Sequence, residues 1–344
     1  MAHTSSRYRL FVGSDVAAST CAVSWMALQA QPTRAILIKQ TPAGFADLQR
    51  QLLAIQPDPN AVLVVLEATG TYWMRLASSL SEAGFAVSVI NPAQAHAFAK
   101  ALLKRSKTDA IDAQTLTELG ARLQPECWTP PPQVHTELQQ RLVHRDGLVA
   151  ARTQFRNQLH ALVQQPIVID SVRTRLESLI ATLDEEIATV EQEIASALKQ
   201  DDAWAAAAVR LATIKGLGTL TIAWLLTTTV TFSLTVTPEA AANYAGLAPQ
   251  LRQSGSSVRG RPRVSHGGNA RLRRAVYMAS LSAIQHNPVI KAFYSRLRAA
   301  GKPRKVALCA AARKLLRLAW AVATKKQDFD PAYAARLGSK AVAE

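Results

Sequence analysis

The segment AVLVVLEA at residues 61–68 constrains the fold of this chain more than any other stretch of its sequence. It is apolar almost without interruption over the length of one strand, a pattern typical of a strand buried on both faces of a sheet. Amphipathic helical signals flank it at 45–55 and 71–84, and a second strand signal at 85–92 ends in proline. Strands that alternate with helices in this way predict an α/β arrangement.

Further β-rich runs precede that alternation. Residues 9–17, 21–28 and 34–40 each carry the short apolar pattern of a strand. Another helix is expected at 107–123. Together these signals predict a mixed α/β sheet domain over residues 7–128.

Consecutive prolines at 130–132 mark a boundary after this domain. Residues 133–200 beyond them are expected to form two long helices, and the second carries an apolar residue every three or four positions, as in the seam of a coiled coil. The seam consists of Leu176, Ile180, Leu183, Ile187, Val190, Ile194 and Ala197. We expect it to pair with a second copy of the chain, with a helical hairpin inside one chain as the alternative. Residues 205–330 are then a third, mainly helical domain.

The positive charge of the chain is concentrated near its C-terminal end. The formal net charge is +16 at pH 7; residues 1–200 hold 18 Lys and Arg against 18 Asp and Glu, and residues 201–344 hold 22 against 6. A basic region of this kind predicts a nucleic acid as partner, although basic side chains also serve as a solvated surface.

Cysteine usage and hydropathy exclude several other classes of protein. Cys21, Cys127 and Cys309 lie far apart and form no CxxC pair, which argues against a zinc site or a disulfide framework and fits a reducing cytoplasm. No segment has the composition of a signal peptide or a membrane span, so we expect no membrane partner.

Four acidic residues of the first domain lie at the ends of predicted strands or at the start of a predicted helix. Asp15 and Glu67 end predicted strands, and Asp109 and Asp112 lie three positions apart at the start of a predicted helix, on one helical face. Carboxylates placed so can share a pocket for Mg²⁺, or Mn²⁺, because such ions take hard oxygen ligands. Paired ions would stabilise the attacking and leaving oxygens of phosphoryl transfer. Taken singly, each acid also has an ordinary use in a turn, at the surface or at a helix dipole.

Residues 243–280 combine turn-forming glycines and prolines with many arginines, and we expect a looped region that leads into a helix. Guanidinium groups bind phosphates, and a serine hydroxyl among them could attack a phosphodiester. Ser254, Ser256 and Ser257 compete for that role, and the alternative is a loop that only binds phosphate through backbone N–H groups. The candidate phosphate contacts here are Arg252, Arg259, Arg261, Arg263, Arg271, Arg273 and Arg274.

Other basic positions are also candidate nucleic-acid contacts. Lys215 precedes a glycine-flanked turn that looks like a helix-hairpin-helix element, although a plain tight turn fits the sequence equally well. Within 133–200, arginines at spacings of 4, 7 and 4 lie on one helical stripe. That stripe consists of Arg141, Arg145, Arg152 and Arg156.

The segments GSDVA at 13–17, LEATG at 66–70 and KTDAIDA at 107–113 resemble, in order and spacing, the transposases of the insertion sequence 110 family. GLAP at 246–249, followed by SG at 254–255, is similar to the part of that family's C-terminal domain that carries a nucleophilic serine.

The resemblance implies a RuvC-like, RNase H-fold N-terminal domain with a set of four metal-binding acids. Residue by residue, that set corresponds to Asp15, Glu67, Asp109 and Asp112, and the nucleophile to Ser254. It further implies a DNA recombinase that moves or inverts a DNA element through a phosphoserine link. The same resemblance implies that a structured guide RNA pairs with donor and target DNA, that the protein assembles as a dimer or tetramer, and that it works at the nucleoid in a bacterial cytoplasm.

Rival classes make different predictions from the same residues. A metal-dependent endonuclease that resolves DNA junctions would keep cleavage in Ser254→Ala but lose it in Asp15→Ala. For a non-catalytic scaffold, neither substitution would change its function, and its affinity for nucleic acid would fall steeply with salt concentration. A recombinase requires both residues and forms a covalent protein–DNA adduct through Ser254.

Overall fold

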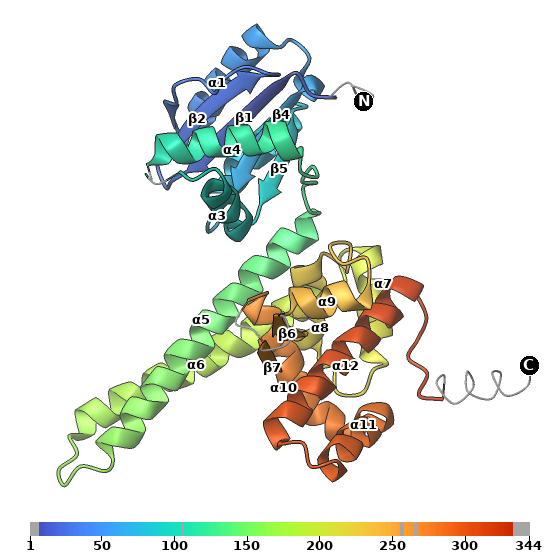
Figure 1. Cartoon of the computed structure of the whole chain (residues 1–344). Helices are drawn as coiled ribbons and strands as arrows, with labels where there is room; N and C mark the ends of the chain where they lie inside the picture. The colour runs from blue at the N-terminus through green and yellow to red at the C-terminus, as the bar shows by residue number, and fades with distance from the viewer. Residues whose placement is uncertain (1–6, 105, 107, 255–257, 265–266, 333–344) are drawn as a thin grey trace, which may run out of the picture. The chain divides into compact units, whose positions relative to one another are not determined.

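The chain folds into two compact units, Met1–Pro130 and Pro131–Glu344, each built around cores of its own (Figure 1). The computed structural model describes residues 7–104, 106, 108–254, 258–264 and 267–332, and it describes the backbone alone for 250–254 and 258–263. The boundary between the units falls within the predicted run of prolines.

A five-stranded mixed sheet forms the centre of the first unit, in the order β3-β2-β1-β4-β5. The central strands β1, β4 and β5 run parallel, whereas β2 is antiparallel to both of its neighbours. The strands are β1 (Leu10–Val16), β2 (Thr20–Ala27), β3 (Ile36–Lys39), β4 (Val62–Glu67) and β5 (Ala86–Ile90). The predicted mixed α/β sheet is therefore confirmed, and its order and strand directions fit an RNase H-like fold.

Helices cover both faces of this sheet, as the apolar β4 requires. On one face, α1 (Pro42–Ile55) and α2 (Trp73–Glu82) pack against Val12 and Val64. On the other face, α3 (Pro92–Ala101) and α4 (Asp109–Leu123) pack against the opposite side of the same strands. The short η1 (Pro59–Ala61) precedes β4.

The helix α3 was not predicted from the sequence. Asn91 caps it by accepting a hydrogen bond from the Ala93 N–H, and Pro92 occupies its first turn. Proline suits that position because its missing N–H has no partner in the first turn of a helix. An Asn-Pro pair after a strand was the available signal, but we interpreted the proline only as the end of β5.

The second unit is mainly helical, as predicted, with one small β-hairpin. Its helices are α5 (Gln133–Leu162), α6 (Asp170–Ala197), α7 (Asp202–Ala212), α8 (Thr219–Thr229), α9 (Pro238–Tyr244), α10 (Ala270–His286), α11 (Pro288–Ala299) and α12 (Arg304–Lys325). Its strands are β6 (Pro249–Ser254) and β7 (Val258–Val264). The first turns of α5 and the last turns of α6 belong to the same hydrophobic core as α7, α8, α10 and α12. The predicted middle region is therefore not a separate domain.

The coiled-coil seam of α6 packs within its own chain. Helices α5 and α6 form a hairpin in which they lie side by side (Figure 1). Ile187, Val190, Ile194 and Ala197 are buried there, and the remaining seam residues are half-buried. Our expectation that this seam pairs with a second copy is corrected to the alternative, because α5 already removes these side chains from water.

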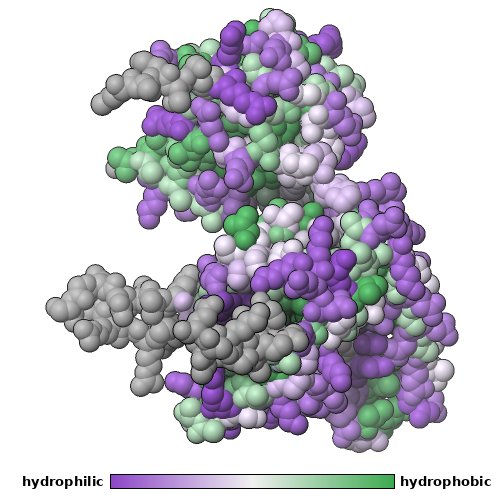
Figure 2. All heavy atoms as spheres, turned by 90° about the vertical axis from the view of Figure 1, so that its right-hand side faces the viewer, coloured by the Kyte–Doolittle hydropathy of each residue, from purple (hydrophilic) through white to green (hydrophobic). Residues whose placement is uncertain are grey.

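In the described residues, no helix is both long enough and apolar enough to cross a membrane. Hydrophilic residues cover much of each unit on the face drawn in Figure 2, with smaller apolar areas between them.

His135 is a buried titratable group at the start of α5. Its ring Nε2 donates to the Thr227 carbonyl at 3.1 Å, and its Nδ1 has no hydrogen-bond partner among the described residues. Burial lowers the pKa of His135, while the bond to Thr227 acts in the opposite direction.

We expect acid to destabilise the second unit through His135. The unfolded chain binds a proton more readily than the folded chain, so stability rises with pH and is lost as pH falls from about 7 to about 5. Thermal unfolding followed across this range should show a larger fall in Tm for the wild type than for His135→Gln, which keeps a donor for Thr227 but does not titrate. Equal falls in the two proteins would contradict the assignment.

Candidate metal centre and nucleic-acid interface

Two of the predicted metal ligands lie at the same end of adjacent parallel strands. The register pairs Ser14 of β1 with Leu66 of β4, so Asp15 and Glu67 come next on neighbouring strands. Side chains alternate between the faces of a strand, and Phe11 on β1 and Val65 on β4 both pack beneath α4. Asp15 and Glu67 therefore project from the face that α4 covers.

The helix α4 crosses this face with its N-terminal end toward those carboxylates. Gly120 lies close to Phe11 and Val65, whereas Ala113 and Thr117 lie against Gly13, farther along β1. Residues before Ala113 thus approach the end of the sheet where β1 and β4 finish. Asp109 and Asp112 belong to this first turn, which Thr108 caps by accepting a hydrogen bond from the Ile111 N–H at 3.3 Å.

A cavity of about 430 Å³ opens at this end of the sheet and brings Glu67 and Asp112 together in its lining. Both side chains are half-buried, and the Thr69 hydroxyl donates to Glu67 Oε1 at 2.7 Å. Asp15 is also half-buried and Asp109 is exposed. Burial, reinforced by the negative charge of Asp15, raises the pKa of Cys21 to about 12, which keeps that thiol protonated.

The predicted convergence of four acids is realised only in part. Within the described residues, no three or more His, Cys, Asp or Glu side chains form a group that could hold a metal ion. Glu67 and Asp112 share the cavity, and Asp15 shares the strand face of Glu67. This set suits Mg²⁺, which is commonly held by one or two carboxylates together with waters and substrate phosphates.

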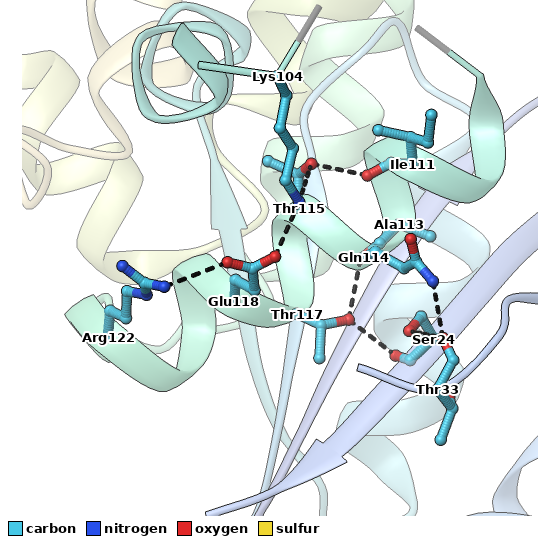
Figure 3. Close-up of polar contacts among 10 residues, drawn as sticks. All are labelled: Ser24, Thr33, Lys104, Ile111, Ala113, Gln114, Thr115, Thr117, Glu118 and Arg122. Atoms are coloured by element: carbon cyan, nitrogen blue, oxygen red, sulfur yellow. Dashed lines mark hydrogen bonds and ion pairs between the residues drawn. The ribbon is translucent and has the colours of Figure 1, made fainter. Parts of the chain in front are cut away.

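Polar contacts fix α4 in place around the cavity (Figure 3). The Thr117 hydroxyl lies 3.0 Å from the Ser24 carbonyl oxygen, and the Gln114 amide donates to the Thr33 carbonyl at 3.0 Å. On another side of the helix, Lys104 bonds to Thr115 and Glu118. Sequence reasoning missed Lys104, because a lysine in the run KRSK has the pattern of a solvated surface.

Ser254 is the last residue of β6, at the turn end of the β-hairpin, where its backbone pairs with Val258. Ser256 and Ser257 lie outside the described residues. Our expectation of a looped region within 243–280 is therefore wrong for the segments that form β6 and β7. The overlooked signal was the alternation of arginine with apolar residues or glycine in VRGRPRV, which has the two-residue period of a strand. Pro262 is tolerated because both strands of a two-stranded sheet are edges.

The β6–β7 hairpin carries four of the predicted phosphate contacts, Arg252, Arg259, Arg261 and Arg263. Its register places Arg263 opposite Gln250 and Arg259 opposite Gln253. Their role as phosphate contacts stays a prediction.

Three predicted arginine contacts on α10 have partners inside the second unit. Arg273 donates to the Gly267 carbonyl at 2.8 Å and to the Ala245 carbonyl at 3.4 Å. Arg274 forms an ion pair with Asp146 of α5, and Arg271 lies over the Trp224 ring at 5.6 Å from its centroid. Arg273 thus closes a loop, while Arg271 and Arg274 remain exposed beside their partners.

The arginine stripe of α5 faces acidic residues of α6. The ion pairs are Arg141 with Glu193 at 3.2 Å, Arg145 with Glu191 at 2.6 Å, Arg152 with Asp184 at 2.6 Å and Arg156 with Asp184 at 2.8 Å. The hydrogen bond from Arg152, with the nearby charge of Arg156, lowers the pKa of Asp184 and keeps it ionised. These pairs give the stripe a structural use and reduce the charge that it offers to a nucleic acid.

The turn after α7 packs against α10. Gly216 has φ +104°, and a Cβ there would lie 2.7 Å from the Ala283 backbone, so the turn requires glycine. The Lys215 carbonyl accepts a hydrogen bond from the Asn287 side chain at 3.3 Å, while Lys215 itself is exposed. The packing explains the turn, and phosphate binding by Lys215 stays a prediction.

Comparison with known proteins identifies the chain as a DNA-processing enzyme of the transposase class. A family described as "Transposase" matches residues 12–167, and the "Transposase IS116/IS110/IS902 family" matches residues 208–295. The chain belongs to the IS110 family of transposases.

Three relatives match this chain over most of their length. The "Pilin gene-inverting protein" of Moraxella lacunata is 30% identical over 292 residues, which is 83% of this chain and 88% of the relative. The protein of the same name from Moraxella bovis is 29% identical, over 94% of this chain and 98% of the relative. The "Transposase for insertion sequence element IS1328" of Yersinia enterocolitica is 26% identical over 79% of this chain and 86% of the relative. A solved structure of Thermus thermophilus RuvC aligns with 33% of this chain and 96% of its own, at 14% identity and a TM-score of 0.26.

The close packing of α4 on β1 at Gly13 leaves no room for a side chain. A Cβ on Gly13 would lie 2.2 Å from the Ala113 carbonyl oxygen and 2.3 Å from the Thr117 nitrogen, so Gly13→Ala must push α4 away from the sheet. We expect a loss of about 1–3 kcal/mol in the free energy of unfolding, measured with urea.

Gly147→Ala is the matched control for this substitution. Gly147 lies within α5 and a Cβ there would meet no atom within 4 Å, so we expect a gain of about 0.5–1 kcal/mol instead. Unchanged stability in Gly13→Ala would show that α4 does not need this close approach.

Proposed function

We propose that this transposase is a Mg²⁺-dependent DNA recombinase that joins its serine to DNA during strand exchange. The observation that carries the proposal is the cavity at the sheet end, where Glu67 from β4 and Asp112 from α4 line one space beside the end of β1. The fold brings them together although 45 positions separate them in the sequence.

The first unit would hold the metal. Its ligands would be Asp15, Glu67, Asp109 and Asp112, of which Glu67 and Asp112 line the cavity. Bound Mg²⁺, or Mn²⁺, would supply charge stabilisation to the phosphate under attack. The ligands on α4 are held by the helix contacts to β1 and β2, so they need little reorganisation when a phosphate arrives.

The second unit would supply the nucleophile and most of the DNA contacts. The Ser254 hydroxyl loses its proton, and its oxygen forms a bond to phosphorus as the bond from phosphorus to a deoxyribose oxygen breaks. That leaving oxygen takes up a proton. In the second step a deoxyribose hydroxyl of the new strand attacks the phosphoserine and releases the serine, so the number of phosphodiester bonds is conserved without an external energy source.

Partners follow from the family and from the charge distribution. The excess of lysine and arginine after residue 200 suits a polyanion, and we propose donor and target DNA together with a structured guide RNA from the element. We also propose a homodimer or tetramer, in which the metal ligands and the serine that act on one phosphate come from one copy or from two. The protein would work at the nucleoid in a bacterial cytoplasm.

The test uses a supercoiled plasmid that carries the coding region of this chain with its flanking noncoding DNA, together with RNA transcribed from that flanking DNA. Full-length wild-type protein should form recombinant junctions, read by sequencing, and a covalent protein–DNA adduct, seen on a denaturing gel. Asp112→Asn, Glu67→Gln and Ser254→Ala should each lower both products by more than about 10³-fold, the scale for loss of a nucleophile or its partners. Chelation should abolish both products, and Mn²⁺ should restore them.

Matched controls separate chemistry from folding. Asp47→Asn alters a half-exposed carboxylate on α1, away from the cavity, and Ser256→Ala and Ser257→Ala alter the competing serines. All three should retain both products. Cleavage that persists in Ser254→Ala without an adduct would identify a metal-dependent nuclease instead, and DNA binding without any cleavage in the wild type would identify a scaffold.

A further inference from the structure

The cavity that contains Glu67 and Asp112 also has a basic side. His96, Lys100 and Lys104 contribute to its lining from α3 and the segment after it. His96 and Lys100 are exposed, whereas only 24% of the Lys104 side chain is exposed. One open cavity therefore has both carboxylates and a partly buried lysine in its lining.

The ammonium of Lys104 is held in position by α4 (Figure 3). Its Nζ donates to Glu118 Oε1 at 2.8 Å and to Thr115 Oγ1 at 3.2 Å. The Thr115 hydroxyl donates its own hydrogen to the Ile111 carbonyl at 2.6 Å, which leaves its oxygen free to act as the acceptor for lysine. Thr115 also lines the cavity and stands one helical turn after Asp112.

The described contacts leave Lys104 with one N–H donor that can bind a further group. An ammonium group has three N–H donors, and Thr115 and Glu118 use two of them. Glu118 does not fully neutralise it, because its other oxygen pairs with Arg122 at 3.4 Å, so two cations share one carboxylate. A donor and surplus positive charge therefore remain for an anion inside the cavity.

We infer that Lys104 binds a non-bridging oxygen of the DNA phosphate that enters this cavity. The inference rests on the proposed function, in which Glu67 and Asp112 hold the metal ion. The phosphate would then lie between the metal on the acidic side and the ammonium on the basic side. Lysine serves as a point charge in phosphate sites, and its contacts to α4 spare the entropy of ordering a long side chain when DNA binds.

A phosphate held from both sides couples metal binding to DNA binding, and such coupling is reciprocal. The test measures Mn²⁺ affinity of the full-length protein by electron paramagnetic resonance, with and without a short DNA duplex of arbitrary sequence. In the wild type the duplex should strengthen Mn²⁺ binding by about tenfold, the scale of one charge-assisted hydrogen bond. Lys104→Met should not lower the Mn²⁺ affinity measured without DNA, because it removes a cation from the cavity, but it should lose most of the strengthening by DNA. Lys104→Arg should restore most of that strengthening.

The variant Arg50→Met is the matched control, because it removes a cation of α1 that pairs with Asp47, and neither residue lines the cavity or contacts Glu118. It should keep the full coupling, whereas Glu118→Gln, which releases the lysine from its ion pair, should weaken it. If Lys104→Met does not fold, the Lys104→Arg and Glu118→Gln proteins carry the comparison.

Several outcomes would overturn the inference. These are full coupling in Lys104→Met, no coupling in the wild type, and coupling with an RNA duplex but not with DNA. Failure of the proposed function looks different, since Glu67→Gln and Asp112→Asn would then bind Mn²⁺ without DNA as tightly as the wild type does.

Discussion

The arrangement of the first unit depends on backbone-to-backbone contact between α4 and β1 at Gly13. A side chain there would lie 2.2 Å from a carbonyl oxygen of α4, so only glycine lets the helix reach the sheet. From that contact follow the position of Asp112 in the cavity beside Glu67 and the position of Thr115 and Glu118 as partners of Lys104. Shape complementarity, rather than attraction among charges, brings like-charged carboxylates to one end of the sheet.

Positive charge in this protein has several uses that its sequence does not distinguish. Arginines of α5 pair with acidic residues of α6, and Arg274 ties α10 to α5, so these groups stabilise the hairpin and its base. Exposed ion pairs contribute little stability singly, but a row of them fixes the relative register of two long helices. Lys215 is exposed in a tight turn, and Lys104 is partly buried beside carboxylates. How well each of these basic side chains can bind a phosphate depends on how many acidic or hydrogen-bonding partners it already has in the protein.

The proposed chemistry is divided between the two units. The carboxylates lie on the sheet and helix of the first unit, and Ser254 lies at the turn end of a hairpin in the second. Under the proposal, a phosphate would engage both units, from one copy or from two, before the serine attacks. Such a division would prevent either unit from cutting DNA alone, which suits an enzyme that must rejoin every strand it breaks.

The sequence by itself determined the mixed sheet, the mainly helical second unit and the boundary at the prolines, because strand and helix periods and proline act locally. It also singled out four acidic positions, whose role as metal ligands stays a prediction. It did not reveal α3, although Asn91 and Pro92 carried a signal for it. Only the tertiary structure decided what covers the α6 seam, which arginines already have acidic partners, and that Lys104 belongs to the carboxylate cavity. The reason is physical: periodicity shows which face of a helix is buried, but the covering surface and the partners of a charge come from segments distant in the chain.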